Sequence, residues 1–109
     1  MEQTELMWVS HIGEAAALVL SGGDIIALRV NPFNKARRQT QFGFKRQKTI
    51  AIGELEDEVI DFTELSMEYW KGMLDFNSLA YYKALDDVRR KRWEFEQTLE
   101  PIKNTINTI

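Results

Sequence analysis

Hydrophobic and polar positions between residues 24 and 48 follow the pattern of a β-hairpin. The first arm, residues 25–30, is rich in the β-branched and aliphatic residues that suit a pleated surface, and Asn31-Pro32-Phe33-Asn34 then supplies turn residues. The second arm begins near Arg38, where two sets of residues alternate: Gln39, Gln41, Gly43 and Lys45 with Thr40, Phe42 and Phe44. This period predicts a strand with one buried and one solvent-facing side.

The N-terminal part predicts an edge strand followed by a buried helix. Thr4 to Val9 is short and tolerates a strand, whereas Ile12 to Leu20 is apolar nearly all round and so predicts a largely buried helix. Ser10 stands where its hydroxyl can accept a hydrogen bond from an orphan amide, which predicts an N-cap. Gly22-Gly23 favours a left-handed exit from the helix.

The segment after the hairpin contains an ambiguous stretch, an acidic stretch and a helix. Residues 49–53 fit either an extension of the second strand or a short third strand. Glu54 to Asp61 is acidic but lacks the glycine and oxygen spacing of a calcium loop, so we interpret it as a solvated loop. Phe62 to Met73 has helical spacing, which predicts a helix from about Thr63 that ends near Gly72.

A long amphipathic helix is expected next, up to about Leu99. Candidate N-caps precede it, namely Asp75, Asn77 and Ser78. Three ion pairs at i,i+4 are expected on its surface: Asp86–Arg90, Asp87–Lys91 and Arg90–Glu94. Roughly 23 residues correspond to about 35 Å, so one end is expected to overhang its own subunit. Exposed Trp93 and Phe95 on such an overhang favour self-association.

The full chain, residues 1–109, is therefore expected to be one α+β domain with a small antiparallel sheet. The hairpin lies at the centre of that sheet, about three helices cover it, and the C-terminal helix is long. No apolar run approaches the roughly 20 residues that span a bilayer, and the start of the chain is acidic where a secretory signal is basic. We expect a cytoplasmic protein without membrane contact. No cysteine and one histidine leave little for disulfides or metal, and no cofactor is expected.

The net charge of −3 conceals a strong segregation of charge along the chain. Residues 1–28 carry four acids and no base, and residues 29–48 carry seven bases and no acid. Residues 49–82 carry eight acids against Lys71, and residues 83–109 carry six bases and five acids. Such blocks can pair within the fold or across a subunit interface, or they can face separate partners.

The order of several short motifs resembles a family of short phage and mobile-element proteins of mostly unknown function. The matching pieces are Ser10 before Ala15-Ala16-Ala17-Leu18 and Gly22, then Phe42-Gly43-Phe44, Tyr69-Trp70-Lys71-Gly72, and residues 85–89. The same broad pattern includes Thoeris anti-defence proteins of the cyclic-ADP-ribose sponge type. The resemblance implies an oligomer that sequesters a nucleotide signal without chemistry, in the cytoplasm of a host cell. Residues 48–61 look like an insertion relative to that pattern.

A candidate ligand site combines arginines of the last helix with nearby aromatic residues. The run at residues 89–92 spreads over all faces of a helix, so only Arg89 and Arg92, at i,i+3, can share one site. Arginine suits phosphate because its planar fork makes bidentate contacts. The candidates to stack on a base are Tyr69, Trp70, Tyr81 and Tyr82, and Trp70 is kept as a ligand candidate with Tyr69. The alternative is structural: surface ion pairs for the cations and packing for the aromatics.

The basic hairpin suggests a second reading, weak nucleic-acid binding through Arg37, Arg38, Lys45 and Arg46. Phosphate neutralisation supplies most sequence-independent affinity, and Phe33 at the tip offers a stacking surface. The alternative is a solvated arm whose cations discourage edge-to-edge aggregation. A third reading is an inhibitor that binds a host defence or transcription complex. No catalytic constellation accompanies His11, so none of these readings is enzymatic.

Overall fold

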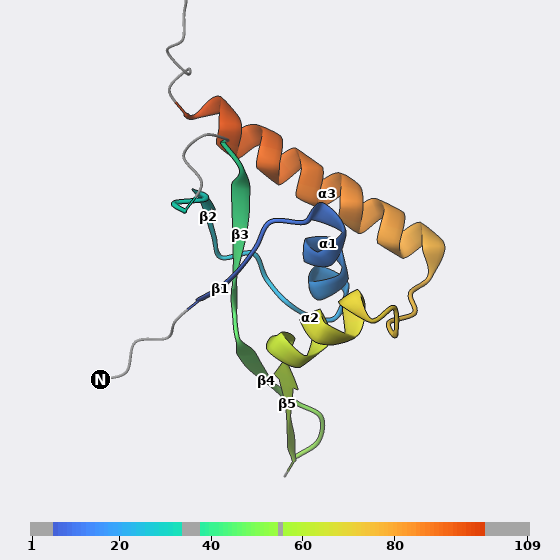
Figure 1. Ribbon diagram of the computed structural model, residues 1–109. Coiled ribbons are helices and arrows are strands. Elements are labelled where there is room, and N and C mark those ends of the chain that lie inside the picture. The colour runs from blue at the N-terminus through green and yellow to red at the C-terminus, as the bar shows by residue number, and fades with distance from the viewer. Residues whose placement is uncertain (1–5, 34–37, 55, 100–109) are drawn as a thin grey trace, which may run out of the picture.

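The computed structural model describes residues 6–33, 38–54 and 56–99, which form an α+β fold (Figure 1). A three-stranded sheet is built from β1 (Leu6–Val9), β2 (Ala27–Val30) and β3 (Thr40–Lys45), and a two-stranded ribbon from β4 (Gln47–Ala51) and β5 (Asp57–Asp61). The helices are α1 (Ile12–Leu20), α2 (Phe62–Trp70) and α3 (Ser78–Gln97). The predicted class, an antiparallel sheet with helices and a long C-terminal helix, is confirmed.

Strand β3 is the centre of the larger sheet, and β1 and β2 pair with it on either side, both antiparallel. Trp8 of β1 lies opposite Gly43, and Arg29 of β2 lies opposite Gln41. The predicted hairpin and the predicted edge strand are therefore confirmed. Thr4 and Glu5 at the start of the expected edge strand, and residues 34–37 in the hairpin connection, lie outside the described residues.

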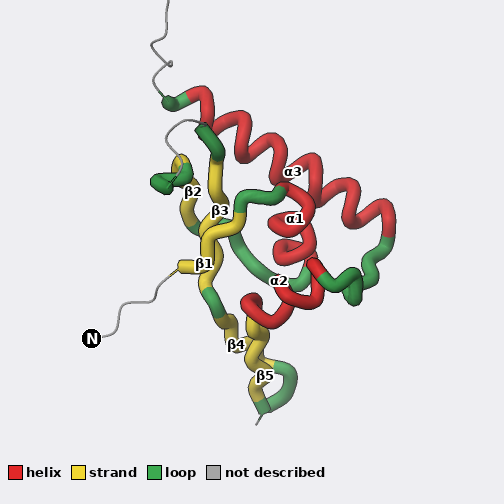
Figure 2. The backbone as a smooth tube through the Cα atoms, viewed as in Figure 1, coloured by secondary structure: helices red, strands yellow, loops and turns green. Residues whose placement is uncertain are grey.

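All three described helices lie on one side of the three-stranded sheet, with α1 next to the sheet and α3 running across it (Figures 1 and 2). The alanines and Leu18 of α1 are fully buried, which agrees with the apolar surface predicted nearly all round this helix. Phe42 and Phe44 project from β3 into the same core, and Val88 of α3 and Phe62 of α2 close it.

The second hairpin arm lacks the solvent-facing side that its alternation predicts. Residues 40–44 are all buried, including the polar Gln41 and Gly43, which has no side chain. The reason is that Trp8 packs across Gly43 from the neighbouring strand, while Arg29 extends over the Trp8 ring. Only Lys45 at the end of the strand is exposed, as predicted for that side.

The ends of α1 show one wrong and one confirmed prediction. The N-cap is His11, which makes no side-chain capping bond, whereas the predicted cap Ser10 accepts a hydrogen bond from Gln41 Nε2 at 3.2 Å. At the other end Gly22 has φ of 107°, and the N–H groups of Gly22 and Gly23 donate to the carbonyls of Val19 and Leu18. This is the left-handed exit that the glycine pair predicts.

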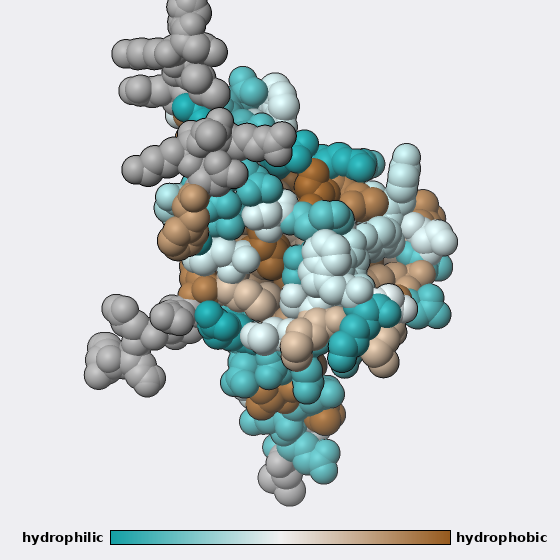
Figure 3. Space-filling view, in the orientation of Figure 1, coloured by the Kyte–Doolittle hydropathy of each residue, from teal (hydrophilic) through white to brown (hydrophobic). Residues whose placement is uncertain are grey.

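The ambiguous and acidic segments together form the β4–β5 ribbon, which projects from the body of the molecule (Figure 1). The interpretation of Glu54 to Asp61 as a loop is therefore wrong for its second half, since residues 57–61 pair with β4. The strand was not predicted from the sequence because acidic residues are poor strand formers. In the structure β5 pairs with β4, where Lys48 lies opposite Ile60. The ribbon is mainly hydrophilic on the face drawn in Figure 3.

The later helices begin where predicted, because side-chain caps define their starts. Asp61 accepts hydrogen bonds from the N–H groups of Thr63 and Glu64, and Asn77 accepts one from that of Ala80. Gly72, with φ of 72°, follows α2 at its predicted end.

The surface of α3 differs from expectation in two respects. Its ion pairs are Arg89–Asp86 at 3.6 Å and Arg90–Asp87 at 2.8 Å, spaced i,i+3, and the predicted i,i+4 pairs do not form among the described residues. The helix also does not overhang freely: Tyr81 near its start and Glu96 near its end both bond to other elements. Trp93 is nevertheless mostly exposed.

Candidate functional site

A cleft of about 480 Å³ opens where α2 turns into α3. Its lining residues come from the last turn of α2, the connecting segment and the first turn of α3: Tyr69, Gly72, Leu74, Phe76, Ser78 and Tyr81. The left-handed Gly72 and the Asn77 cap fix the two ends of the connecting segment. This volume lies within the range of roughly 300–1,000 Å³ that is usual for small-molecule sites.

Aromatic rings form the walls of the cleft. Phe76 and Tyr81 stack with their ring centroids 5.9 Å apart and only 3° between the planes. Behind them the Tyr81 hydroxyl donates a hydrogen bond of 3.0 Å to the Gly13 carbonyl oxygen, which ties the cleft to α1. A Cβ added to Gly13 would lie 2.5 Å from the Tyr69 hydroxyl and 2.9 Å from that of Tyr81, so this position needs glycine for space.

The Tyr69 hydroxyl is held in its neutral form. Burial raises the pKa of Tyr69 to about 12, and the hydrogen bond with the Tyr81 hydroxyl and the nearby charge of Glu14 act in the same direction. A neutral phenol donates a hydrogen bond and does not act as a base. The cleft can therefore stack on a planar ligand, with the two tyrosine hydroxyls held by partners inside the protein.

Large exposed apolar side chains lie on the helix ends and connecting segment that form the cleft. Four of them are more than half exposed: Trp70, Met73, Leu79 and Tyr82. Trp70 lies edge-on to Tyr69 at 5.1 Å and to His11 at 5.0 Å between ring centroids. Large exposed apolar residues close to a concave site are typical of a binding surface. We call these four residues the apolar rim.

The structure brings together only part of the predicted ligand site. Tyr69 lines the cleft and Trp70 stands on its rim, but Arg89 and Arg92 follow Tyr81 on α3 by about 12 and 16 Å along the helix axis. Arg89 instead pairs with Asp86. Sequence reasoning missed Phe76, because it precedes the helix and shares no periodicity with the Tyr81 ring on which it stacks.

The predicted nucleic-acid residues are also separated. Arg38 lies just before β3, while Lys45 ends it and Arg46 follows, about 23 Å away along an extended strand. All three are exposed, and Arg37 lies outside the described residues.

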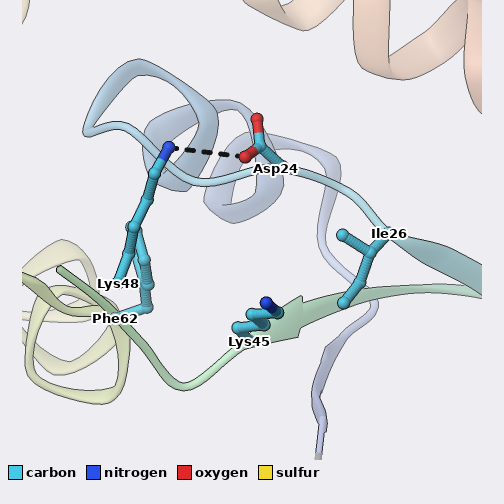
Figure 4. A pocket seen from close by; sticks show the side chains of 5 residues that line it. All are labelled: Asp24, Ile26, Lys45, Lys48 and Phe62. Carbon is cyan, nitrogen blue, oxygen red and sulfur yellow. Dashed lines mark hydrogen bonds and ion pairs between the residues drawn. The ribbon is translucent and has the colours of Figure 1, made fainter. Parts of the chain in front are cut away.

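Lys45 also borders a second, smaller hollow of about 120 Å³ (Figure 4). Its lining is completed by Asp24, Ile26, Lys48 and Phe62, and the Lys48 ammonium pairs with Asp24 at 3.4 Å. The hollow is much smaller than the usual small-molecule site, and part of its positive charge is already matched by Asp24. The α2–α3 cleft is therefore the stronger candidate.

The described part of the chain contains no group of three or more potential metal-ligating side chains, and none of its helices is long and apolar enough to cross a membrane. Comparison with known protein families, with curated proteins and with solved structures finds no match for this chain.

Proposed function

We propose that this protein is a non-enzymatic binding protein that sequesters an anionic nucleotide signal as a homo-oligomer. The observation that carries the proposal is the α2–α3 cleft, whose walls include the rings of Tyr69, Phe76 and Tyr81. Aromatic faces stack on bases of any identity. The cleft is proposed to receive the base of the nucleotide.

The proposed oligomer follows from the lack of positive charge in the lining of the cleft. No lysine or arginine is among its lining residues, so cations from outside the cleft must meet the phosphates of a bound nucleotide. The apolar rim is a surface on which a second copy can pack, and that copy brings another α3 with Arg89 and Arg92. Both arginines then serve across a subunit boundary, although they lie far from the cleft of their own chain.

The motif resemblance favours the same kind of function. The chain resembles sponge-type anti-defence proteins, and this resemblance implies that it binds a nucleotide without altering it chemically. We therefore propose a phage-type accessory role in a host cytoplasm. The raised pKa of Tyr69 keeps its phenol neutral, and a neutral phenol does not act as a base towards a bound ligand.

Calorimetry and native mass spectrometry with a panel of cyclic and linear nucleotides test the proposal. The expected result is retention of one nucleotide class, intact, by a particle larger than the 12.7 kDa chain. Phe76→Ala removes a cleft wall and should weaken binding at least tenfold. Phe33→Ala, which removes an exposed aromatic that does not line the cleft, should not. Arg89→Gln and Arg92→Gln should weaken binding without changing the oligomer. Absence of binding across the panel rejects nucleotide sequestration, and a 12.7 kDa particle rejects the oligomer.

A second candidate is a protein-interaction inhibitor of a host defence or transcription complex. The apolar rim is the specific observation that favours it, because large exposed apolar side chains mark protein interfaces as well as oligomer contacts. If this second function is correct, we expect the protein to be a monomer that does not bind nucleotides. It also expects capture of one host protein by the wild-type chain but not by a Trp70→Ser, Leu79→Ser variant.

A further inference from the structure

Three side chains meet on one face of the sheet. Gln41 alternates along β3 with Phe42 and Phe44, which face the core and the helices, so this face is the one opposite the described helices. Each strand of the sheet contributes one member: Trp8 from β1, Arg29 from β2 and Gln41 from β3. The strand register brings these three side chains together, because Trp8 lies opposite Gly43 and Arg29 lies opposite Gln41 on the central strand. None of these residues belongs to the α2–α3 cleft.

The guanidinium of Arg29 is held in place from two directions. Its Cζ lies 4.1 Å from the centroid of the Trp8 ring, and its Nε donates a hydrogen bond of 2.8 Å to Gln41 Oε1. Gln41 is itself oriented, because its Nε2 donates to Ser10 Oγ at 3.2 Å. Gly43 provides the space, since a Cβ there would be 2.9 Å from the Trp8 ring. The arginine is thus pre-organised.

Arg29 lacks a counter-charge within the described part of the chain. Its Nε bonds to a neutral amide, neither terminal nitrogen hydrogen-bonds to a described residue, and no described carboxylate pairs with it. The three strands contain Arg29 and Lys45 and no acid. A fixed planar fork whose two terminal nitrogens bond to no described residue matches the oxygens of a phosphate.

The placement of the other cations points to an extended ligand rather than a small one. Exposed Arg38 lies at one end of β3 and exposed Lys45 and Arg46 at the other, with Arg29 between them. Cations spread over about 23 Å along one strand cannot all reach a mononucleotide, but they can follow a polyanion.

An exposed aromatic side chain adds a stacking surface next to this track. Phe33, just beyond β2, is 86% exposed, and its backbone N–H donates to Asn31 Oδ1 at 2.9 Å, which fixes the turn. Unpaired bases stack on such side chains, whereas bases inside a duplex do not offer their faces. We propose that the helix-free face of the sheet binds single-stranded nucleic acid, with Arg29 as a phosphate contact. This inference is independent of the nucleotide cleft.

Fluorescence anisotropy with labelled single-stranded 20-mers of dT and of U tests the inference. Binding is expected at about 50 mM salt, with a steep loss of affinity by about 200 mM because counterions are released. Arg29→Gln should weaken binding about fivefold or more and reduce the slope of log affinity against log salt by about one. Lys91→Gln is the matched control: it removes one exposed charge from α3, and we expect it to change neither quantity.

Arg29→Lys separates charge from geometry, because it keeps the cation but loses the planar fork. It should retain the salt slope yet bind more weakly than the wild type. Circular dichroism must show the same fold in all variants, and Arg29→Lys replaces Arg29→Gln if the latter unfolds. No binding at 50 mM salt, equal loss in Arg29→Gln and Lys91→Gln, or equal affinity for a duplex overturns the inference. Arg29→Gln should leave nucleotide calorimetry unchanged, so the two proposals fail separately.

Discussion

Thr40 Oγ1, at the start of the central strand, donates a hydrogen bond of 2.7 Å to Glu96 Oε2, near the end of the long helix. The two residues are 56 positions apart in the chain, and Thr40 is only 4% exposed. With the Tyr81–Gly13 bond near the other end, this contact fixes α3 at two points across the fold. The orientation of the cleft relative to the sheet follows from those two anchors.

Thr40→Val should lower the free energy of unfolding by about 1–2 kcal/mol, because it removes a hydrogen bond to a charged acceptor while keeping the shape of the side chain. Urea denaturation measures the change. Thr49→Val is the control, since Thr49 is exposed on β4. Equal stability of the two variants would show that the Thr40–Glu96 bond contributes nothing.

Gly43→Ala should destabilise the protein by about 1–3 kcal/mol, because the new methyl group would overlap the Trp8 ring at 2.9 Å. Displacement of Trp8 should also change the tryptophan fluorescence of the folded protein. Gly53→Ala is a matched control with nothing within 4 Å of the added Cβ, and it should alter stability by less than about 0.5 kcal/mol. An unaltered Gly43→Ala spectrum would argue against the packing of Trp8 across the sheet.

Ser66→Ala should destabilise the fold by about 1–3 kcal/mol, since the Ser66 hydroxyl donates to the carboxylate of Glu14, which is buried between α1 and α2. The variant leaves that carboxylate without this donor. Thermal or urea unfolding gives the change in stability, with the exposed Ser78→Ala as the control. A stability equal to that of Ser78→Ala would contradict the role of the bond.

The raised pKa of Tyr69 predicts a loss of stability in alkali. In the folded protein the Tyr69 phenol has a pKa of about 12, whereas in the unfolded chain it has the ordinary pKa of 10.0. The contribution to stability is therefore complete below pH 10 and is lost as the pH rises towards 12. Absorbance at 295 nm should show a tyrosine titrating near pH 12 that disappears in Tyr69→Phe. The same titration in that variant and the wild type would contradict the assignment.

Local signals in the sequence were sufficient for most of the secondary structure. The bounds of α1 and the hairpin follow from apolar periodicity and turn residues, and the starts of the later helices follow from caps such as Asn77. Glycine in a left-handed conformation marks the ends of α1 and α2. These features depend on residues within one or two turns of each other.

The errors arise where distant residues decide the outcome. Ser10 is used by Gln41 rather than by its own helix, and the polar side of β3 is covered by Trp8 and Arg29 from neighbouring strands. Tyr69 and Tyr81 of the cleft could be anticipated from the sequence, but Phe76 could not, because its stacking on Tyr81 depends on the path of the connecting segment. Periodicity gives the face of an element but not what packs on it.

The base of the β4–β5 ribbon is hydrogen-bonded to the body of the protein. The Phe62 N–H donates to the Arg46 carbonyl at its base, and Lys48 reaches the Gly22 carbonyl at 2.9 Å. An isolated pair of strands is only marginally stable in water. The outer residues of the ribbon should thus exchange their amide hydrogens early, while β3 stays protected. Shortening the tip should be tolerated, which makes it a suitable place to attach a label without disturbing either proposed site.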